Sequence, residues 1–407
     1  MQLRTAWRAL PPGLRTRFWL TINATSELAV TANARLRGAC QEGPLILSGF
    51  AESAFGIARG AQSTRDGLRA AGYEPHLAPI EPVLRCGRLG EARLLPERPG
   101  GVWILHANAP EAHAVLSRTR PSDWRGRYRI GVWAWELPVA PASWVRMARA
   151  FDEVWVPSRF VAESLAGART RVVTVPHYVP LPPEPMGPPP TFRVLAAGDA
   201  KSSLSRKGVA DALAAYLRAF PEPMPSVELV VKVTDAKRAG GEVAALTATR
   251  SDVSVRTDTL SEDGMARLQA SAAVFLSMHK AEGFGLMIAE HLALGRPAIA
   301  TGWSGNMDFM KSFGELTVGY TLESVADPSG VYAGHEGQRW AVPSVGDAAA
   351  KLRRAYDRWL GGHLVDPRYA AAISAQNAAW RTARLDGVAR WTRRKDPGGG
   401  PAMAPLA

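Results

Sequence analysis

The strongest constraint on the fold is an alternation of apolar, strand-like runs and helical segments that occurs twice along the chain. In the first half, the apolar runs lie at residues 43–50, 101–110, 129–138, 153–158 and 171–176. In the second half, they lie at residues 192–199, 227–235, 272–279 and 296–301. Near-continuous apolar strands separated by helices are typical of a parallel sheet covered by helices on both faces. We therefore predict an α/β protein with two Rossmann-like domains that face a cleft.

A proline-dense stretch, "PLPPEPMGPPPTF" at residues 180–192, separates the two patterns and is typical of a linker. The predicted divisions are an N-terminal arm (1–40), a first domain (41–182), a Pro-rich linker (183–191), a second domain (192–370), a C-terminal helical segment (371–396) and a disordered tail (397–407). Ligands of parallel sheets bind beyond the carboxyl ends of the strands, so the cleft between the domains is the predicted site.

The composition excludes several classes of protein. Hydrophobic residues make up 46% of the 407 residues and charged residues 21%, which is typical of a globular protein. The two cysteines, Cys40 and Cys86, form neither a disulfide framework nor a metal-binding spacing. We find no signal-peptide pattern and no apolar run of about 18 residues that would span a membrane. The expected location is the cytoplasm.

The net charge of +12 predicts attraction to polyanions. The arginines are dispersed, however, and no nucleic-acid-binding motif is present, so no nucleic-acid partner is expected. Residues 1–40 mix aromatic and basic side chains around a Pro11-Pro12 interruption. Two interpretations stay open for them: a peripheral contact with the inner membrane face, or a packed or loose arm, which is slightly favoured.

The stretch "HKAEGFGLMIAEHLALGRPAIATGWSGNMDF" at residues 279–309 holds two glutamates, Glu282 and Glu290, separated by seven residues. Glu282 lies in the turn after a predicted strand, where Gly283 and Gly285 leave free amide groups at a helix start, which suits a diphosphate. Glu290 lies within the helix and could accept hydrogen bonds from a ribose diol. The alternative is a plain helix start with Glu290 in a buried salt bridge.

Basic residues near other strand ends favour the ligand interpretation. Arg206 and Lys207 in "SLSRKG" (203–208) follow the first strand of the second half, and Lys232 lies in the next strand. Cations at strand ends around a glycine-rich helix start would form a diphosphate pocket.

These motifs resemble those of glycosyltransferase family 4, a group of retaining enzymes with GT-B architecture. The likeness includes "WAWELPVAPASWVRMARAFDEVWVPSRFVAESL" (133–165) and "RWAVPSVGDAAAKLR" (339–353), covers roughly residues 43–355, and is most specific in the second half. It implies transfer of a sugar from a nucleoside diphosphate sugar to a glycan or lipid-linked acceptor, in polysaccharide or glycolipid biosynthesis. Apart from this co-substrate, neither a cofactor nor a metal is expected.

The resemblance implies roles for individual residues. Glu282 corresponds to the first family glutamate, near the transferred sugar, Glu290 to the second, on the ribose, and Lys207 to a diphosphate-binding lysine. The backbone near the diphosphate and sugar is then that of Gly283, Phe284, Gly285 and Leu286. A family arginine that precedes the lysine has three candidates here: Asp199, Lys201 and Arg206.

The first domain leaves one role unassigned. Many members carry a histidine near the reacting face of the donor, and both His106 in "ILHANAP" and Glu136 in "WAWELP" are candidates for its place. Gly49 in "SGFAESAFGIARG" (48–60) resembles the first glycine loop of the fold.

The expected chemistry is stabilisation of the charge that grows on the leaving diphosphate, by Lys207, Arg206 and the helix start, in place of a metal. Two other functions are alternatives for this sequence: an epimerase-like protein of the same fold and a non-enzymatic basic protein that binds polyanions. The pairing of "RKG" with the two glutamates disfavours the first, and the dispersed arginines disfavour the second.

Overall fold

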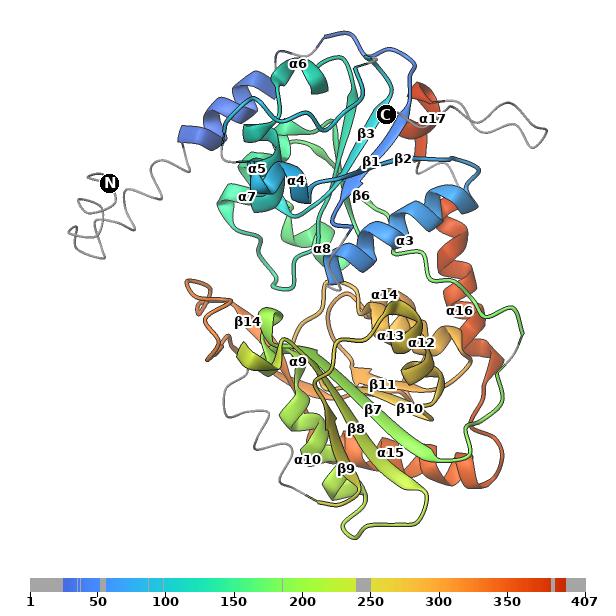
Figure 1. Ribbon diagram of the computed structural model, residues 1–407. Helices are drawn as coiled ribbons and strands as arrows, with labels where there is room; N and C mark the ends of the chain where they lie inside the picture. Colours follow the sequence, from blue (N-terminus) through green and yellow to red (C-terminus); the bar gives the residue numbers. More distant parts are fainter. Residues whose placement is uncertain are drawn as a thin grey trace.

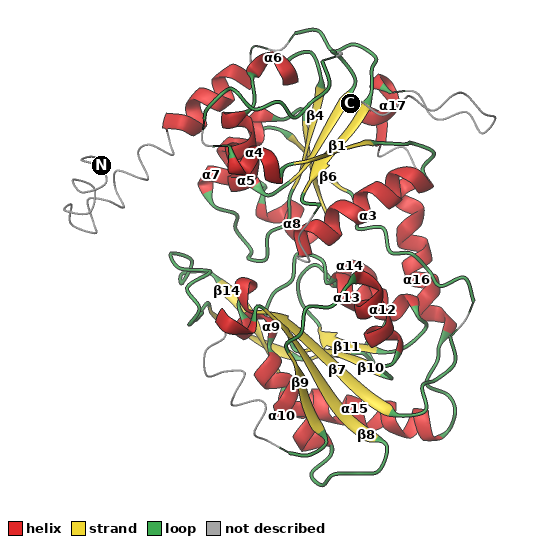
Figure 2. Ribbon diagram, in the orientation of Figure 1, coloured by secondary structure: helices red, strands yellow, loops and turns green. Residues whose placement is uncertain are grey.

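The computed structural model describes residues 25–392, apart from residues 35, 37, 52–55, 87, 98, 185, 239–249 and 382–384. Two parallel six-stranded sheets, one in each half of the chain, form the frame of the molecule (Figure 1). Helices flank the sheet in each half, as Figure 2 shows. The prediction of two Rossmann-like α/β domains is confirmed. Residues 1–24 of the predicted arm and the predicted tail, 397–407, lie outside the described residues.

The first sheet has the strand order β2-β1-β3-β4-β5-β6, and all its neighbours pair in parallel. Its strands are β1 (Leu45–Gly49), β2 (His76–Pro79), β3 (Val102–His106), β4 (Tyr128–Val132), β5 (Glu153–Val156) and β6 (Arg171–Thr174). Its helices are α3 (Gly56–Ala70), α4 (Glu81–Arg85), α5 (Ala109–Arg118), α6 (Pro121–Trp124), α7 (Ala142–Met147) and α8 (Arg159–Ser164). The order reverses between β1 and β3, so the loops after these strands flank a topological switch point.

The second sheet has the order β12-β11-β10-β7-β8-β9, again parallel throughout. Its strands are β7 (Phe192–Asp199), β8 (Val227–Thr234), β9 (Val253–Arg256), β10 (Val274–Ser277), β11 (Ala298–Thr301) and β12 (Thr317–Val318). Its helices are α9 (Leu204–Lys207), α10 (Val209–Ala219), α12 (Glu262–Ala270), α13 (Leu286–Ala293), α14 (Met307–Met310) and α15 (Val345–Leu360). Here the order reverses between β7 and β10, and the loops after these two strands carry the predicted motifs.

One predicted strand is shorter in the structure than in the sequence pattern. The apolar run 129–138 pairs only as far as Val132, and residues 133–140 form a loop. Trp133 and Trp135 explain the apolar continuation, because their side chains are buried in the core of the first domain without strand pairing. The loop places Glu136 at the carboxyl end of the first sheet.

The chain passes between the domains at two places. The first is the stretch before β7. The second follows α16 (Pro367–Asn377), whose Tyr369 and Ile373 are buried in the core of the second domain. Beyond it, the short helix η4 (Ala378–Arg381) and α17 (Asp386–Trp391) return to the first domain, where the rings of Trp380 and Trp155 lie 6.1 Å apart. Figure 1 shows this return in red along one side of the molecule.

Residues 25–34, the described helical part of the predicted arm, pack on the first domain. Val30 and Ala34 are buried in its core, and Arg129 donates a hydrogen bond to the Ala34 carbonyl at 2.9 Å. Across the described part of the chain, no helix combines the length and hydropathy that crossing a bilayer requires.

A hairpin interrupts the second domain before α15. Strands β13 (Tyr320–Ser324) and β14 (Arg339–Pro343) pair antiparallel, and residues 325–338, which we call the strap, connect them. The strap residues Val325 and Tyr332 are buried in the core of the first domain. In Figure 1 the orange hairpin reaches from the second sheet towards the first domain.

Candidate active site

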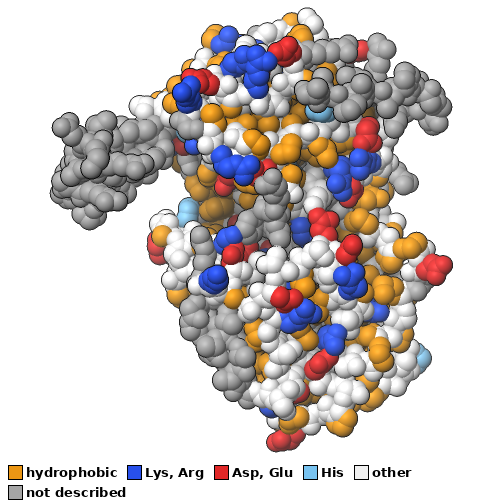
Figure 3. All heavy atoms as spheres, in the orientation of Figure 1, with side chains coloured by type: hydrophobic (Ala, Val, Ile, Leu, Met, Phe, Trp, Pro, Cys, Tyr) orange, Lys and Arg blue, Asp and Glu red, His pale blue; other side chains and the backbone are white. Residues whose placement is uncertain are grey.

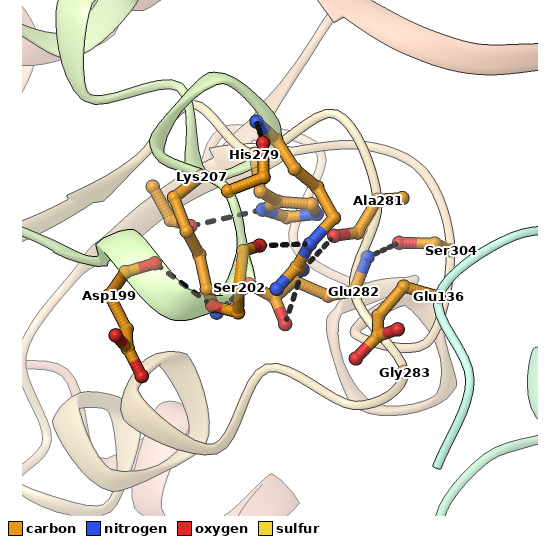
Figure 4. A network of polar contacts seen from close by, with 12 residues as sticks. Glu136, Asp199, Ser202, Lys207, His279, Ala281, Glu282, Gly283 and Ser304 are labelled. Atoms are coloured by element: carbon orange, nitrogen blue, oxygen red, sulfur yellow. Dashed lines mark hydrogen bonds and ion pairs between the residues drawn. The ribbon is translucent and has the colours of Figure 1, made fainter. Parts of the chain in front are cut away.

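Glu282 forms the centre of the site, in the loop that follows β10. Its Oε1 lies 2.5 Å from the Lys207 Nζ, and its Oε2 lies 3.4 Å from an Arg206 Nη1 (Figure 4). The Glu282 residue is only 9% exposed. Burial alone would raise the pKa of its carboxyl, but the charges of Lys207 and Arg206 outweigh burial and lower the pKa from 4.5 to about 2. Glu282 is therefore ionised at neutral pH.

The local backbone explains how Arg206 and Lys207 reach Glu282. They occupy α9, a single turn capped by Ser203, whose Oγ accepts from the Arg206 amide at 3.1 Å. Gly208 ends the turn with φ +64°, and a Cβ there would lie 1.7 Å from the Met278 carbonyl oxygen, so only glycine fits. Because α9 touches the end of β10 at this point, its basic side chains meet the loop that carries Glu282.

Arg206 has a structural role as well as a charge. Its guanidinium is buried and donates to the carbonyls of Ala281 at 2.6 Å and Ser202 at 3.1 Å. It thereby joins the loop after β7 to the loop after β10. Lys207, a quarter exposed, is the cation of the pair that a ligand can reach.

A second loop, after β11, fixes the backbone of Glu282. The Glu282 amide donates to Ser304 Oγ at 2.9 Å, and its carbonyl accepts from the Gly305 amide at 2.9 Å. A Cβ on Gly305 would lie 2.1 Å from the Gly283 carbonyl oxygen, so the loops touch at their backbones. Ser304 and Gly305 thus support the glutamate loop.

The residues after Glu282 lead directly into α13. Gly285 precedes the helix with φ +89°, and the first amide groups of any helix lack intrahelical partners. The Gly283 carbonyl accepts from Ser158 Oγ of the first domain at 2.6 Å. The Phe284 ring is buried, 4.9 Å from the His177 ring, and Leu286 begins the helix. The predicted backbone segment therefore lies at a helix start where the two domains meet.

Glu290 lies farther along α13 and pairs across the domains. It forms an ion pair with Arg59 of α3, and its Oε2 accepts from Gln269 Nε2 at 2.7 Å. Burial raises the pKa of the Glu290 carboxyl above its ordinary value. The structure thus forms a salt bridge at Glu290, the alternative to ribose binding that the sequence left open, although both of its side chains are partly exposed.

Glu136 of the first domain joins the Glu282 group through a tyrosine. Its Oε2 accepts from the hydroxyl of Tyr332 in the strap at 3.1 Å, and the Arg206 guanidinium carbon lies 6.0 Å from the centre of the Tyr332 ring. Glu136, Tyr332, Arg206 and Glu282 therefore form one continuous network that crosses between the domains.

His106, the other candidate, belongs to a separate cluster. It ends β3, its Nδ1 lies 3.0 Å from Thr64 Oγ1, and its ring stacks on His177 with centroids 6.3 Å apart. Burial, reinforced by the neighbouring His177, lowers the pKa of His106 to about 3. Burial, reinforced by Arg59, lowers that of His177 to about 4. Both imidazoles are neutral at pH 7, and His177 rather than His106 contacts the glutamate loop.

The structure does not bring Lys232 to the Glu282 network. Its ammonium is buried and donates to the carbonyls of Asp258 at 2.7 Å and Val233 at 3.2 Å. The reason is sheet order, because β8 lies on the side of β7 away from β10.

Gly49 does lie at the carboxyl end of β1, as the sequence predicts. A Cβ at this position would come 2.9 Å from the Ala61 Cβ. Because glycine has no Cβ, α3 can pack closely against β1 here.

Three residues contact the site although no sequence pattern predicts that they do: Arg59, His177 and Tyr332. Arg59 is one of many dispersed arginines, and His177 lies in a stretch that reads as linker. Tyr332 lies in a loop without periodicity. Within the described ranges, no group of three or more His, Cys, Asp or Glu side chains is arranged to hold a metal ion.

Comparison with known proteins supports the predicted family resemblance for one segment of the chain. Residues 159–359, which include Lys207, Glu282 and Glu290, match the family described as "Family 4 Glycosyltransferase in conflict systems". This segment is similar to the family 4 glycosyltransferases. The predicted resemblance is confirmed, and the class of enzyme is glycosyltransferase. No curated protein matches the sequence.

Solved structures share the fold of this glycosyltransferase at low identity. A glycosyltransferase from Rickettsia africae is 13% identical with a TM-score of 0.55, covering 85% of this chain and 98% of that one. Trehalose-6-phosphate synthase OtsA is 12% identical with a TM-score of 0.52, covering 86% and 99%. A variant of S. aureus TarM, in complex with fondaparinux, alpha-GlcNAc-glycerol and UDP, is 12% identical with a TM-score of 0.51. That match covers 71% of this chain but spans only 55% of the TarM chain.

Proposed function

We propose that the protein transfers a sugar from a nucleoside diphosphate sugar to an acceptor hydroxyl, with retention of the anomeric configuration. The observation that carries this proposal is the ionised Glu282 held by Lys207 and Arg206 at the switch point of the second sheet. An acid and a cation side by side suit a ligand that has both a polyhydroxylated sugar and a diphosphate. The same residues lie within the segment that matches the family.

The donor diphosphate would lie at the start of α13, next to Lys207. The first amide groups of that helix and the helix dipole both favour a negative charge. As the bond from the sugar to the diphosphate breaks, the electron pair stays with the phosphate oxygen, and the charge there increases. Lys207 stabilises this charge more in the transition state than in the ground state, which accelerates the reaction.

Glu282 would lie on the sugar side of the same bond. Its ionised carboxylate can accept hydrogen bonds from sugar hydroxyls and stabilise positive charge that develops at the reacting carbon. The acceptor oxygen forms the new bond to that carbon, and its proton passes to an oxygen of the leaving diphosphate, which has gained the electron pair. Arg206, buried beneath Glu282, keeps the carboxylate in place during the exchange.

Glu290 would hold the nucleotide ribose. Its carboxylate pairs with Arg59 of the other domain, so ribose hydroxyls compete with that guanidinium for the same oxygens. Donor binding would therefore loosen a contact between the domains, which links occupancy of the site to domain movement.

The nature of both substrates is also part of the proposal. The TarM structure contains UDP and alpha-GlcNAc-glycerol, so uridine nucleotides are the first donors to test. The proposed acceptor is a glycan or a lipid-linked sugar, as expected for an enzyme of polysaccharide or glycolipid biosynthesis. We place the enzyme in the cytoplasm, with or without contact to the inner membrane face. On the face shown in Figure 3, Lys and Arg side chains are scattered over both domains.

Binding of the donor can be tested by a thermal-shift screen. UDP, GDP, ADP and their common sugars are added to the protein with EDTA present. A ligand at a hundredfold excess over its dissociation constant stabilises the folded state by about 2.7 kcal/mol. One nucleoside diphosphate should raise the melting temperature of the wild type and of Lys311→Ala, which changes an exposed lysine, but much less that of Lys207→Ala. If no nucleotide shifts the wild type, or if Lys207→Ala responds fully, the proposed site is wrong.

A further inference from the structure

The strap contacts the phosphate-binding side of the site at its first residues. The Asp327 Oδ1 accepts from Ser203 Oγ at 2.6 Å, and the Asp327 Oδ2 accepts from the Tyr332 amide at 3.2 Å. Ser203 is the residue that caps α9, which carries Arg206 and Lys207. The start of the strap is therefore attached to the element that presents the two cations.

The end of the strap holds the loop 133–140 of the first domain. Gln338 forms two hydrogen bonds with Val139: its Oε1 accepts from the Val139 amide at 2.8 Å, and its Nε2 donates to the Val139 carbonyl at 2.9 Å. The centroids of the His335 and Trp135 rings lie 5.2 Å apart. One segment thus joins the cations of the second domain to the loop that carries Glu136.

Tyr332 lies between these two attachments. Its ring is 6.0 Å from that of Trp135, and its hydroxyl donates to Glu136. Burial raises the pKa of the Tyr332 phenol well above its ordinary value, so the hydroxyl keeps its proton and acts as a donor. The loop 133–140 has no strand pairing to fix Glu136, and this hydrogen bond orients its carboxylate instead.

The neighbouring contacts place Glu136 at the reacting end of the donor site. A Cβ on Gly283, the residue after Glu282, would lie 3.1 Å from the Trp135 carbonyl oxygen. The residue before Glu136 thus touches the residue after Glu282, and Figure 4 shows Glu136 beside that loop. Glu136 therefore lies on the first-domain side of the loop that carries Glu282.

We propose that Tyr332 is a positioning residue for sugar transfer: it holds the Glu136 carboxylate so that Glu136 orients the acceptor hydroxyl towards the donor sugar. The inference rests on the proposed function and adds a role for the strap. Small displacements of a positioned reactant cost large factors in rate, since the geometry must be correct before the bond exchange begins. Loss of the hydrogen bond should therefore lower kcat and leave donor binding nearly unchanged.

Tyr332→Phe separates this role from a purely structural one. The ring is 4% exposed and packs in the first-domain core, so its removal would test packing, whereas phenylalanine removes only the hydroxyl. Tyr320→Phe is the matched control, because Tyr320 lies on β13 with 40% exposure. The second variant is Glu136→Gln, alone and combined with Tyr332→Phe.

The experiment measures kcat and donor KM for transfer, together with the thermal shift caused by UDP, in the full-length protein. We expect Tyr332→Phe and Glu136→Gln each to lower kcat by about tenfold or more, with donor KM and the UDP shift within about twofold of wild type. The double variant should be no slower than Glu136→Gln, because Tyr332 acts on transfer only through the Glu136 carboxylate, which Glu136→Gln has already removed. Tyr320→Phe should behave as wild type.

Three results would overturn the inference. Wild-type kcat in Tyr332→Phe would show that the hydroxyl positions nothing, and effects that multiply in the double variant would show that Tyr332 and Glu136 act separately. A loss confined to donor KM would place Tyr332 in donor binding instead. If the wild type neither bound a nucleotide nor transferred a sugar, the proposed function itself would fall, and the inference with it.

Discussion

Replacing Glu282 by glutamine tests the electrostatics of the site directly. The substitution keeps the shape of the side chain and removes its charge. Arg206, which is only 2% exposed, then lacks its carboxylate partner, and Lys207 loses its 2.5 Å contact with an anion. Breaking a buried ion pair from one side usually destabilises a protein by about 3–5 kcal/mol.

The lowered pKa of Glu282 gives a second, independent value for how much the ion pair stabilises the folded protein. A fall from 4.5 to about 2 corresponds, at about 1.36 kcal/mol per unit, to about 3 kcal/mol of stability at pH 7. The pKa is lower in the folded state, so this stability is present above about pH 4.5 and is lost as the pH falls towards 2. For domains of this size, the expected decrease in Tm is about 6–12 °C at pH 7. The difference between variant and wild type should shrink below pH 4.5.

Thermal unfolding at pH 7 and at pH 3.5, with and without UDP, provides the assay. The diphosphate supplies the negative charge that the variant lacks, so UDP should raise the Tm of Glu282→Gln at least as much as that of the wild type. Transfer should fall by about two orders of magnitude or more. Glu323→Gln, on the exposed strand β13, is the control. Equal Tm values at pH 7, a pH-independent difference, or a wild-type transfer rate would refute the reasoning.

Three further changes test other parts of the structure. Lys207→Ala should weaken UDP binding by roughly tenfold in a calorimetric titration, since a charge-assisted contact to the diphosphate is lost, and an unchanged affinity would place the diphosphate elsewhere. Burial lowers the pKa of His291 to about 3, so protonation of the unfolded chain below about pH 6.5 costs stability. Between pH 7 and pH 5, the free energy of unfolding measured with urea should therefore fall by about 2 kcal/mol less in His291→Leu than in the wild type. If the difference between variant and wild type were the same at both pH values, the buried imidazole would not be neutral. Gly208→Ala should lower the Tm markedly, because its Cβ would clash with the Met278 carbonyl, and a Tm equal to that of the wild type would contradict the positive φ.

The fold was predictable because parallel strands buried on both faces have to be apolar along most of their length. The run 192–199 coincides with β7, and the run 227–235 exceeds β8 by one residue. The pattern failed where burial comes without strand pairing, as at Trp133 and Trp135, and where strands are short or exposed, as in β12 and β13.

The candidate site was predictable only in part. Lys207 and Glu282 follow strands that become neighbours in the sheet, and each lies in a motif that marks a strand end. The sequence placed Lys232 in a strand but did not give the order of strands, and that order takes it away from β10. Tyr332 reaches the site through the strap, a contact across the two domains to which no local pattern points.

The return of the chain to the first domain has a consequence for its synthesis. The Trp380 indole packs against Trp155 and donates to the Pro176 carbonyl at 2.9 Å, and the Gly43 amide donates to the Trp391 carbonyl at 3.1 Å. The half that leaves the ribosome first therefore lacks part of its core until the residues after α16 have been made. The second domain, encoded in between, can fold while the first is still incomplete, so the earlier domain finishes last.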